Sequence, residues 1–445
     1  MYDVVFLGSG HSCWHGAVAL AAAGKKVALV DGDLPGGTCT NYGCDAKIIL
    51  DGPFEFAEGL ERYQDVCVDG NGKIDWQRLM AYKRQVLAPF PQMMPAMFQN
   101  MGIDFIPAFG KLQDAHTVIA GDQVLETEYV VIGTGQHDSV LNIPGKEFMH
   151  NSREFLDIEQ MPEHLVCIGA GIISMEFASM ALVLGKKVTF IEFADRALAA
   201  YPKKYVDKLV DKMRAQGAEF HFGEAASSVE EIEGGYRVTT NSGLTVEGDY
   251  VLCAAGRVAN VEGLGLEELG IQASRRGIVV DEYLRTSVPT IYASGDVIDK
   301  AIPRLTPTAE FESNYIAGHI LGAPDPICYP AVPNLVFTLP RIAQAGVTVD
   351  EAAAQPETYR VIELPYGVQN EWVNNRELDC EMTLIVDKDA HLAGAAIYGS
   401  EGGTWIDFLT LAINTKLTGA QLRSMIFAFP TQTYMLANIL AGALA

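Results

Sequence analysis

The chain has 445 residues, 49% of them hydrophobic, and 32 basic against 56 acidic residues give it a formal net charge of −24. This length predicts about two to four domains with ample core, and the 43 glycines favour an α/β enzyme with many tight turns. The negative charge disfavours nucleic acid and anionic membrane as partners, and no uncharged apolar run approaches the roughly 20 residues of a membrane span.

The first segment follows the order strand, glycine loop, helix, strand, with these elements expected at 3–7, 8–10, 17–23 and 26–30. Gly8 permits a tight turn, and Gly10 lets a pyrophosphate approach the N–H groups at the helix N-terminus. Asp31 is placed to accept hydrogen bonds from a ribose, and Cys13 occupies the position of the third glycine of this fingerprint. Because the strand begins at the third residue, we expect no targeting segment and a cytoplasmic protein.

A pair of cysteines, Cys39 and Cys44, follows this loop with four residues between them. Beside a bound flavin, such a pair predicts electron transfer between the flavin and a disulfide. The 8 cysteines are scattered, which disfavours a secreted disulfide scaffold, and a structural zinc site would need a second Cys/His pair that the chain lacks. The alternative interpretation is two unrelated buried thiols.

A second dinucleotide unit begins at 165–168, where an apolar strand leads into Gly169 and Gly171, a helix and a strand that ends at Glu192. Two such units imply two dinucleotides. A carboxylate at Glu192 can hydrogen-bond a ribose 2′-hydroxyl but would repel a 2′-phosphate, so NADH is expected rather than NADPH. Arg196 could compensate in part.

With both loops and the cysteine pair assembled, the chain resembles the class I flavoprotein disulfide reductases, which include glutathione reductase, dihydrolipoamide dehydrogenase and mercuric reductase. Further stretches resemble turns of that family: Gly133-Thr134-Gly135, Ala255-Gly256-Arg257, the segment 290–296, Leu305-Thr306-Pro307 and the segment 332–338. The resemblance implies an α/β fold with two Rossmann-like dinucleotide-binding domains, for FAD and NAD, and a C-terminal α+β dimerisation domain. The implied order is FAD domain (1–148), NAD domain (149–262), the second part of the FAD domain (263–325) and the interface domain (326–445).

The resemblance also implies roles for individual residues. Cys44 would be the charge-transfer thiol against the flavin, and Cys39 the interchange thiol that attacks a substrate disulfide. Lys47 would pair with Glu176 near flavin N5, the alternative being two solvated charges. The residues expected to contact FAD or NADH are Gly8, Gly10, Asp31, Gly37, Thr38, Thr134, Gly135, Gly169, Gly171, Glu192, Gly256, Arg257, Gly295, Asp296, Leu305 and Thr306.

The chain departs from the family pattern at its C-terminus. In the family, a histidine and a glutamate of the other subunit provide acid–base catalysis, and here Phe429 and Tyr434 replace them. Phenylalanine cannot shuttle protons, and general acid–base help is typically worth about 10²–10⁴ in rate. His11 and His15 lie on one face of the first helix, so a relocated proton shuttle at His15 is predicted. The alternative is that His11 caps the helix and His15 merely packs.

These observations predict a homodimeric, FAD-dependent NADH:disulfide oxidoreductase that acts on a small disulfide through Cys39 and Cys44. An NADH-dependent reductase of quinones, oxygen or metal ions is one alternative, and a redox sensor without turnover is another. No resident metal is expected. The methionines of 93–101 are interpreted as the apolar stripe of a helix, and the five remaining cysteines from Cys67 onward mostly as core thiols. The apolar stretch Tyr434 to Ala445 is expected to form a helix packed on a partner.

Overall fold

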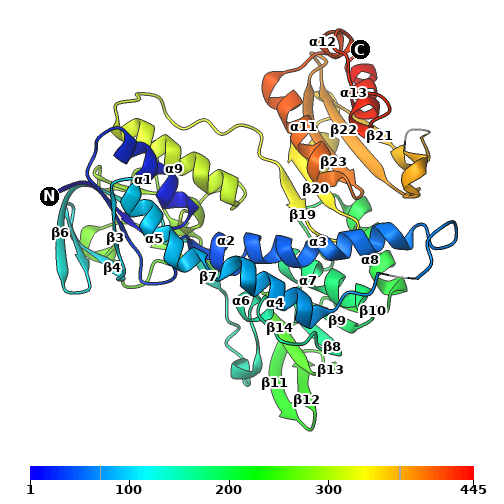
Figure 1. Ribbon diagram of the computed structural model, residues 1–445, viewed down its shortest axis with the longest axis horizontal. Coiled ribbons are helices and arrows are strands. Elements are labelled where there is room, and N and C mark those ends of the chain that lie inside the picture. Colours follow the sequence, from blue (N-terminus) through cyan, green and yellow to red (C-terminus); the bar gives the residue numbers. More distant parts are fainter. Residues whose placement is uncertain (71, 370–371) are drawn as a thin grey trace.

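The computed structural model describes residues 1–70, 72–369 and 372–445. It contains three α/β units, and the long helix α3 (Cys44–Glu61) runs between them (Figure 1). The first unit lies at the left of Figure 1, the second below α3, and the C-terminal unit above it. The mixed α/β fold predicted from the sequence is therefore confirmed.

The first unit is built on a seven-stranded sheet of order β3-β2-β1-β6-β5-β4, with β18 paired to β6. Its strands are β1 (Tyr2–Leu7), β2 (Val27–Val30), β3 (Ile103–Ile106), β4 (Gly110–Asp114), β5 (Thr117–Ala120), β6 (Gln123–Ile132) and β18 (Ile291–Ala293). The parallel strands are largely apolar because both faces of their sheet are covered, one by helices and the other by the antiparallel strands β4 and β5, where Gly110 lies against Leu7 and Val30. Since β18 follows the whole second unit in sequence, the chain leaves the first unit and later returns to complete it.

Two long helices pack together against this sheet. Helix α1 (His11–Ala22) begins six residues earlier than the stretch expected from composition, directly after the glycine loop. It lies against α9 (Thr306–Ile320), where the Gly16 N–H donates to Ser313 Oγ at 2.9 Å. A Cβ on Gly16 would meet the Ser313 carbonyl oxygen at 2.5 Å, so the two backbones touch at this point. This contact fixes the first turns of both helices relative to each other.

The second unit repeats the same design with a four-stranded parallel sheet of order β10-β9-β8-β14. Its strands are β8 (His164–Ile168), β9 (Lys187–Glu192), β10 (Ala218–Phe222) and β14 (Tyr250–Cys253), and an antiparallel sheet adds β11 (Ala226–Ile232), β12 (Gly235–Thr240) and β13 (Thr245–Gly248). Helix α7 (Ile172–Val183) is buried almost all round, and it lies with α8 (Lys203–Ala215) on one face of the parallel sheet, whose other face packs against β11, β12 and β13. The strands β7 (Gln136–Asp138) and β15 (Arg257–Ala259) pair where the chain crosses between the two units.

The C-terminal unit is an antiparallel sheet of order β19-β20-β23-β22-β21 covered by helices. Its elements are β19 (Asn334–Val336), β20 (Ile342–Gly346), α10 (Val349–Ala353), β21 (Tyr359–Leu364), β22 (Glu381–Asp387), β23 (Leu392–Tyr398), α11 (Gly402–Thr415), α12 (Gly419–Arg423) and α13 (Gln432–Ala443). The expected terminal helix is present, but it packs inside its own domain. Leu436 and Leu440 are fully buried in the core of this unit, which corrects the expectation of packing on a partner.

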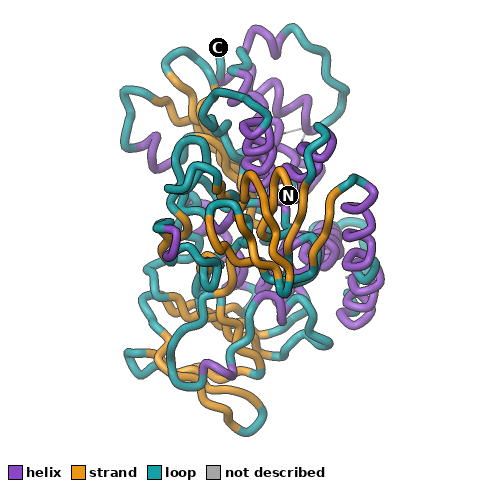
Figure 2. Tube along the Cα trace, turned by 90° about the vertical axis from the view of Figure 1, so that its left-hand side faces the viewer, coloured by secondary structure: helices purple, strands orange, loops and turns teal. Residues whose placement is uncertain are grey.

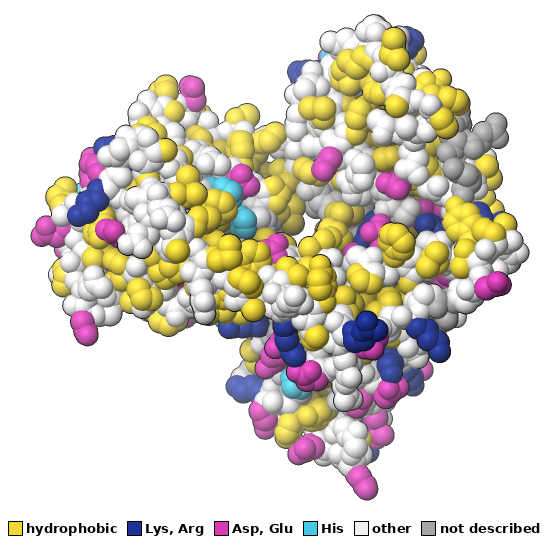
Figure 3. All heavy atoms as spheres, viewed as in Figure 1, with side chains coloured by type: hydrophobic (Ala, Val, Ile, Leu, Met, Phe, Trp, Pro, Cys, Tyr) yellow, Lys and Arg dark blue, Asp and Glu magenta, His cyan; other side chains and the backbone are white. Residues whose placement is uncertain are grey.

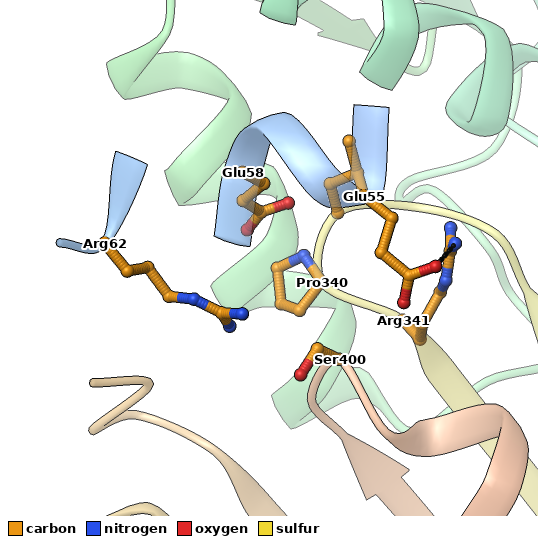
Figure 4. Close-up of a pocket in the computed structure, with 7 residues that line it drawn as sticks. Glu55, Glu58, Arg62, Pro340, Arg341 and Ser400 are labelled. Atoms are coloured by element: carbon orange, nitrogen blue, oxygen red, sulfur yellow. Dashed lines mark hydrogen bonds and ion pairs between the residues drawn. The ribbon is translucent and has the colours of Figure 1, made fainter. Parts of the chain in front are cut away.

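Buried charges tie the C-terminal unit to α3. The Arg341 guanidinium donates to Asp51 Oδ1 at 3.0 Å and to Glu55 at 3.1 Å, and both Arg341 and Asp51 are almost completely buried. Figure 4 shows Glu55 and Arg341 facing each other, with Arg62 just beyond the last residue of α3. Arg62 pairs in turn with Glu377 at 3.1 Å. The orientation of the third unit is thus fixed by charge pairs as well as by apolar packing.

Further helices lie beside α3. Figure 2, turned by 90°, shows them stacked at one side of the sheet of the first unit. They include α4 (Trp76–Leu87) and α5 (Phe90–Asn100), with α6 (Ser152–Phe155) nearby in the second unit. The predicted methionine stripe holds only in part, because Met94 is buried whereas Met93 and Met101 are exposed.

The cysteines predicted as core thiols also divide into two groups. Cys167, Cys253 and Cys380 are buried, as expected. Cys67 and Cys328 are exposed, because each lies in a turn or loop rather than in a strand. The expectation of a core position was therefore wrong for these two.

Candidate active site

The two cysteines of the predicted redox pair meet where two helices join. Cys39 lies in the short helix α2 (Gly37–Tyr42), Gly43 interrupts the helical path, and Cys44 is the first residue of α3. Both are free thiols, and Cys44 Sγ lies 3.5 Å from Thr306 Oγ1 at the start of α9. Residues distant in sequence thereby come together at one thiol.

The two thiols differ in acidity. A hydrogen bond from Cys39, together with Thr306 and the nearby Lys47 cation, lowers the pKa of Cys44 to about 6, although burial acts in the opposite direction. The hydrogen bond to Cys44 and burial raise the pKa of Cys39. Cys44 is therefore the thiolate of the pair at neutral pH, the state needed for a charge-transfer thiol.

An ion pair lies next to the thiols. Lys47 Nζ lies 3.0 Å from Glu176 Oε2, and the Glu176 carboxylate also accepts the Phe337 N–H at 2.9 Å. Lys47 Nζ lies 4.1 Å from the centre of the Phe337 ring. Glu176 is buried, and burial raises its pKa although Lys47 lowers it. These two residues are not solvated charges, and they join all three units beside the cysteine pair.

The helices that begin at this site lack side-chain caps. Helices α1 at Gly10, α7 at Gly171 and α9 at Leu305 have no side-chain cap and no acidic residue in the first turn. Elsewhere, α4, α10, α12 and α13 are capped by Asp75, Thr348, Thr418 and Thr431, whereas α5, α8 and α11 also lack caps. Uncapped N-termini leave backbone N–H donors free for the anionic or carbonyl groups of a ligand.

The predicted FAD loops share one edge of the first sheet. Leu7, Ile132 and Ala293 are in register on neighbouring parallel strands, so the loops that follow them project from the same edge. These loops and the adjoining α2 and α9 carry Gly8, Gly10, Gly37, Thr38, Thr134, Gly135, Gly295, Asp296, Leu305 and Thr306. A crevice at the carboxyl ends of parallel strands is where nucleotides bind in this type of sheet.

Two local observations fit a flavin dinucleotide here. A Cβ on Gly37 would lie 2.7 Å from Gly10 Cα, so α2 can abut the start of α1 only because residue 37 is a glycine. Two buried polar atoms near the helix starts, Trp14 Nε1 and Thr308 Oγ1, have no protein partner among the described residues. Asp31 accepts from the Ser9 N–H at 2.8 Å and closes the loop from behind.

The second sheet presents an equivalent edge. Ile168, Ile191 and Cys253 are in register, which brings together the loops that carry Gly169, Gly171, Glu192 and Gly256. Apart from its neighbours along the chain, no atom of the described residues lies within 4 Å of the Cβ position at Gly171 or Gly256, so the space above each is open. Arg257, for which a cofactor contact is predicted, also joins two elements of the fold. Its guanidinium pairs with Asp138 at 2.9 Å and ties the two units together.

The two histidines of α1 form a hydrogen-bonded pair. His11 Nδ1 lies 3.0 Å from His15 Nε2, and the Trp14 ring stacks on His15 with 3.6 Å between ring centres. α1 has no side-chain cap, so His11 does not cap it. In Figure 3, histidine and apolar side chains face the hollow between the first unit and the C-terminal unit.

The replaced C-terminal motif lies at the surface. The Phe429 ring packs edge-on against Tyr434 with 5.1 Å between ring centres and is 69% exposed. No titratable group thus stands in place of the family histidine.

Two functional candidates escaped the sequence reasoning. Glu310, one turn beyond Thr306 on α9, lies 3.6 Å from His15 Nδ1. Glu312 is fully buried and accepts the Gly295 N–H and the Lys300 ammonium, each at 2.6 Å, so it holds the turn that carries Asp296. Glu310 could have been found from the sequence, because it lies four residues after Thr306 and thus on the same face of the helix. Nothing in the local sequence indicates that Glu312 is buried.

The fold contains two dinucleotide-type units. Between them, a polarised thiol pair lies next to an uncapped helix and a buried ion pair. These features together define a nucleotide-dependent dithiol–disulfide oxidoreductase. The chain belongs to the pyridine nucleotide-disulphide oxidoreductase family, which matches residues 2–313, and the dimerisation domain of that family matches residues 332–438. The enzyme is accordingly a pyridine nucleotide-dependent flavoprotein that acts on sulfur groups, as predicted.

Individual relatives agree with this assignment. The dihydrolipoyl dehydrogenase of Bacillus subtilis is 30% identical over 444 residues, covering 96% of this chain and 93% of that protein. The HOCl-induced flavoprotein disulfide reductase RclA from Escherichia coli matches with a TM-score of 0.88 at 25% identity, covering 100% of this chain and 99% of that one. RclA has also been solved as a Cu(II) complex, which matches with a TM-score of 0.87 at 25% identity over 98% of each chain. LpdA from Mycobacterium tuberculosis shares the fold, with a TM-score of 0.90 at 24% identity over 100% of both chains.

Within the described ranges, no helix is both long and apolar enough to span a lipid bilayer.

Proposed function

We propose that the protein is a homodimeric enzyme that passes electrons from NADH, through bound FAD and the Cys39–Cys44 pair, to a small disulfide. The observation that carries this proposal is the setting of Cys44. Its thiol lies 3.5 Å from Thr306 Oγ1 at the uncapped start of α9, and its pKa is lowered to about 6. FAD, when bound by the loops described above, supplies a two-electron carrier that reduces the Cys39–Cys44 disulfide.

The chain's own residues then perform thiol–disulfide exchange. The Cys39 thiolate attacks one substrate sulfur, so a Cys39–substrate disulfide forms while the substrate S–S bond breaks. The released thiolate takes a proton from the hydrogen-bonded pair of His11 and His15. Cys44 then attacks Cys39 Sγ, restores the Cys39–Cys44 disulfide and releases the second substrate thiolate, which is protonated in turn. Two electrons and two protons convert one disulfide into two thiols, and NADH with one solvent proton supplies them.

Two side chains favour NADH as the electron donor. Glu192 accepts the N–H groups of Ala170 and Ala194, which holds its carboxylate at the end of β9 where a ribose would lie. Arg196 donates to backbone carbonyls, including that of Tyr201 at 3.1 Å, and so is not free to bind a 2′-phosphate. The proposal therefore assigns no 2′-phosphate contact to Arg196.

Dimerisation would cover a set of exposed apolar side chains. Phe56 on α3 is 75% exposed, and Ile426 and Phe429 in the C-terminal unit are 100% and 69% exposed. The match to the family's dimerisation domain supports a second copy of this chain as the occupant. All eight cysteines are free thiols, in keeping with a reducing compartment such as the cytoplasm.

The decisive experiment follows NADH oxidation by the FAD-loaded enzyme with a panel of small disulfides. Cys39→Ser should abolish disulfide turnover, whereas Cys328→Ser, which changes an exposed thiol outside the site, should leave it unchanged. If the Cys39→Ser enzyme still reduced every disulfide that the wild type reduces, the proposal would be overturned.

A second candidate function, reduction of metal ions, is favoured by one specific observation. His11 Nδ1 and His15 Nε2 lie 3.0 Å apart. With metal–nitrogen bonds of about 2.0–2.1 Å, this spacing corresponds to an angle of roughly 95°, close to the cis angle of tetragonal Cu(II) sites. Copper-dependent NADH oxidation that is lost in His11→Ala but kept in Cys39→Ser would support this alternative.

A further inference from the structure

Glu310 gives His15 a carboxylate partner from within the same chain. Its Oε1 lies 3.6 Å from His15 Nδ1, and the side chains of His15 and Glu310 are 17% and 46% exposed. The family pattern pairs a histidine with a glutamate at the C-terminus, and both are replaced here by Phe429 and Tyr434. A histidine–carboxylate pair therefore exists in this protein, but on α1 and α9.

The packing of α1 against α9 sets this pair about one helical turn from the contact between Thr306 and Cys44. On α9, Thr306 contacts Cys44, and Glu310 lies four residues further, about 6 Å along the helix axis. The close contact between Gly16 and Ser313 fixes the register of the two helices one residue after His15. The carboxylate thus lies one helical turn from the residue that contacts the thiolate.

The contacts determine which nitrogen atoms can carry protons. With Nδ1 of His15 facing the carboxylate, its proton is directed to Glu310, and Nε2 is left to accept from His11 Nδ1 at 3.0 Å. His11 Nε2 is then the outer end of this series of hydrogen-bonded groups. His11 directly follows Gly10, which abuts Gly37 at the start of the helix that carries Cys39.

We propose that Glu310, His15 and His11 form one proton relay that serves the interchange thiol, with Glu310 as the positioning residue. This inference rests on the proposed disulfide reductase function. His11 Nε2 takes the proton of the Cys39 thiol, His11 Nδ1 passes its own proton to His15 Nε2, and Glu310 stabilises the resulting imidazolium. The same proton returns along the chain to the substrate thiolate that leaves, so no net proton is gained or lost in the relay.

The surroundings of His15 support this arrangement. The stacked Trp14 ring limits rotation of the imidazole, so the carboxylate decides which nitrogen is protonated. Burial lowers the pKa of His15, whereas Glu310 raises it. The titratable groups placed against His15 are His11 from its own helix and Glu310 from α9.

Reaction of the NADH-reduced, FAD-loaded enzyme with a small disulfide, followed by stopped flow from pH 5 to pH 9, tests the relay. The neutral relay accepts the thiol proton, so the rate should rise with pH through the pKa of the relay. Glu310→Gln removes the charge that raises this pKa. The acidic limb, the part of the pH–rate profile in which the rate rises with pH, should therefore move to lower pH, and the maximal rate should fall about 10-fold or more. Glu310→Asp should recover part of both effects, because it keeps the carboxylate.

Asp325→Asn, which removes one exposed charge beyond the far end of α9, is the matched control and should match the wild type. A merely structural role of Glu310 would lower the rate or the melting temperature without moving the limb. An unchanged limb and rate in Glu310→Gln, in an enzyme whose turnover still requires Cys39, would overturn the relay alone. Loss of the Cys39 requirement would instead overturn the proposed function.

Discussion

The Lys47–Glu176 ion pair should control the acidity of Cys44, and the two members should act in opposite directions. Lys47 lies three residues after Cys44 on α3, which places their side chains about 6 Å apart. At that distance, loss of the cation should raise the Cys44 midpoint by about 0.5 pH units if the site behaves like water and by about 2 if the effective dielectric constant is 20. In the Lys47→Met enzyme, the titration midpoint of the Cys44 thiol should therefore lie between about pH 6.5 and pH 8.

Glu176→Gln should do the reverse. The amide can still accept the Phe337 N–H, but it leaves the Lys47 cation unopposed, so the Cys44 thiolate should persist to a lower pH. The readout is the long-wavelength charge-transfer absorbance of the two-electron-reduced, FAD-loaded enzyme, recorded against pH. In the wild type it should be half lost near pH 6, since a thiol with a pKa of about 6 is about 90% ionised at pH 7.

Lys203→Met, which removes an exposed cation from α8, provides the charge-matched control and should titrate like the wild type. Midpoints that move in the same direction in Lys47→Met and Glu176→Gln would refute the electrostatic reasoning. So would an absorbance that persists after Cys44→Ser, because the thiolate would then belong to another residue.

Three further predictions concern the cofactor, the C-terminal segment and stability. NADH should exceed NADPH in kcat/KM by about tenfold or more, and Glu192→Gln should narrow the ratio; equal values in the wild type would contradict the assignment of this carboxylate. Phe429→His should raise disulfide turnover little, since Tyr434 cannot orient an imidazole as a carboxylate would. A large gain would show that the histidine base, which in the family comes from the other subunit, can be restored. Arg341→Met should destabilise the fold by about 3–5 kcal/mol in chemical denaturation by leaving Asp51 buried and unpaired, and the additional change Asp51→Asn should recover part of that loss.

Part of the site could be predicted because it depends on local backbone geometry. A glycine loop between a strand and a helix exposes N–H donors wherever it occurs, so Gly10 and Gly171 could be identified from the sequence alone. The cysteine pair and the acidic residue at the end of each second strand are equally local features. The family, the fold class and the kind of chemistry followed from these short segments.

Other features depended on which surfaces the folded chain brings together. Glu310 and His15 lie almost 300 residues apart in sequence, and only the close packing of α1 on α9 makes them partners. The exposure of Cys67 and the burial of α13 within its own domain likewise follow from packing, since the same residues are compatible with either environment. The sequence by itself determined the dinucleotide loops and the redox pair, because backbone conformation and spacing suffice for them. Which charges surround that pair was decided by the tertiary structure, because a carboxylate acts on an imidazole or a thiol only within a few ångströms.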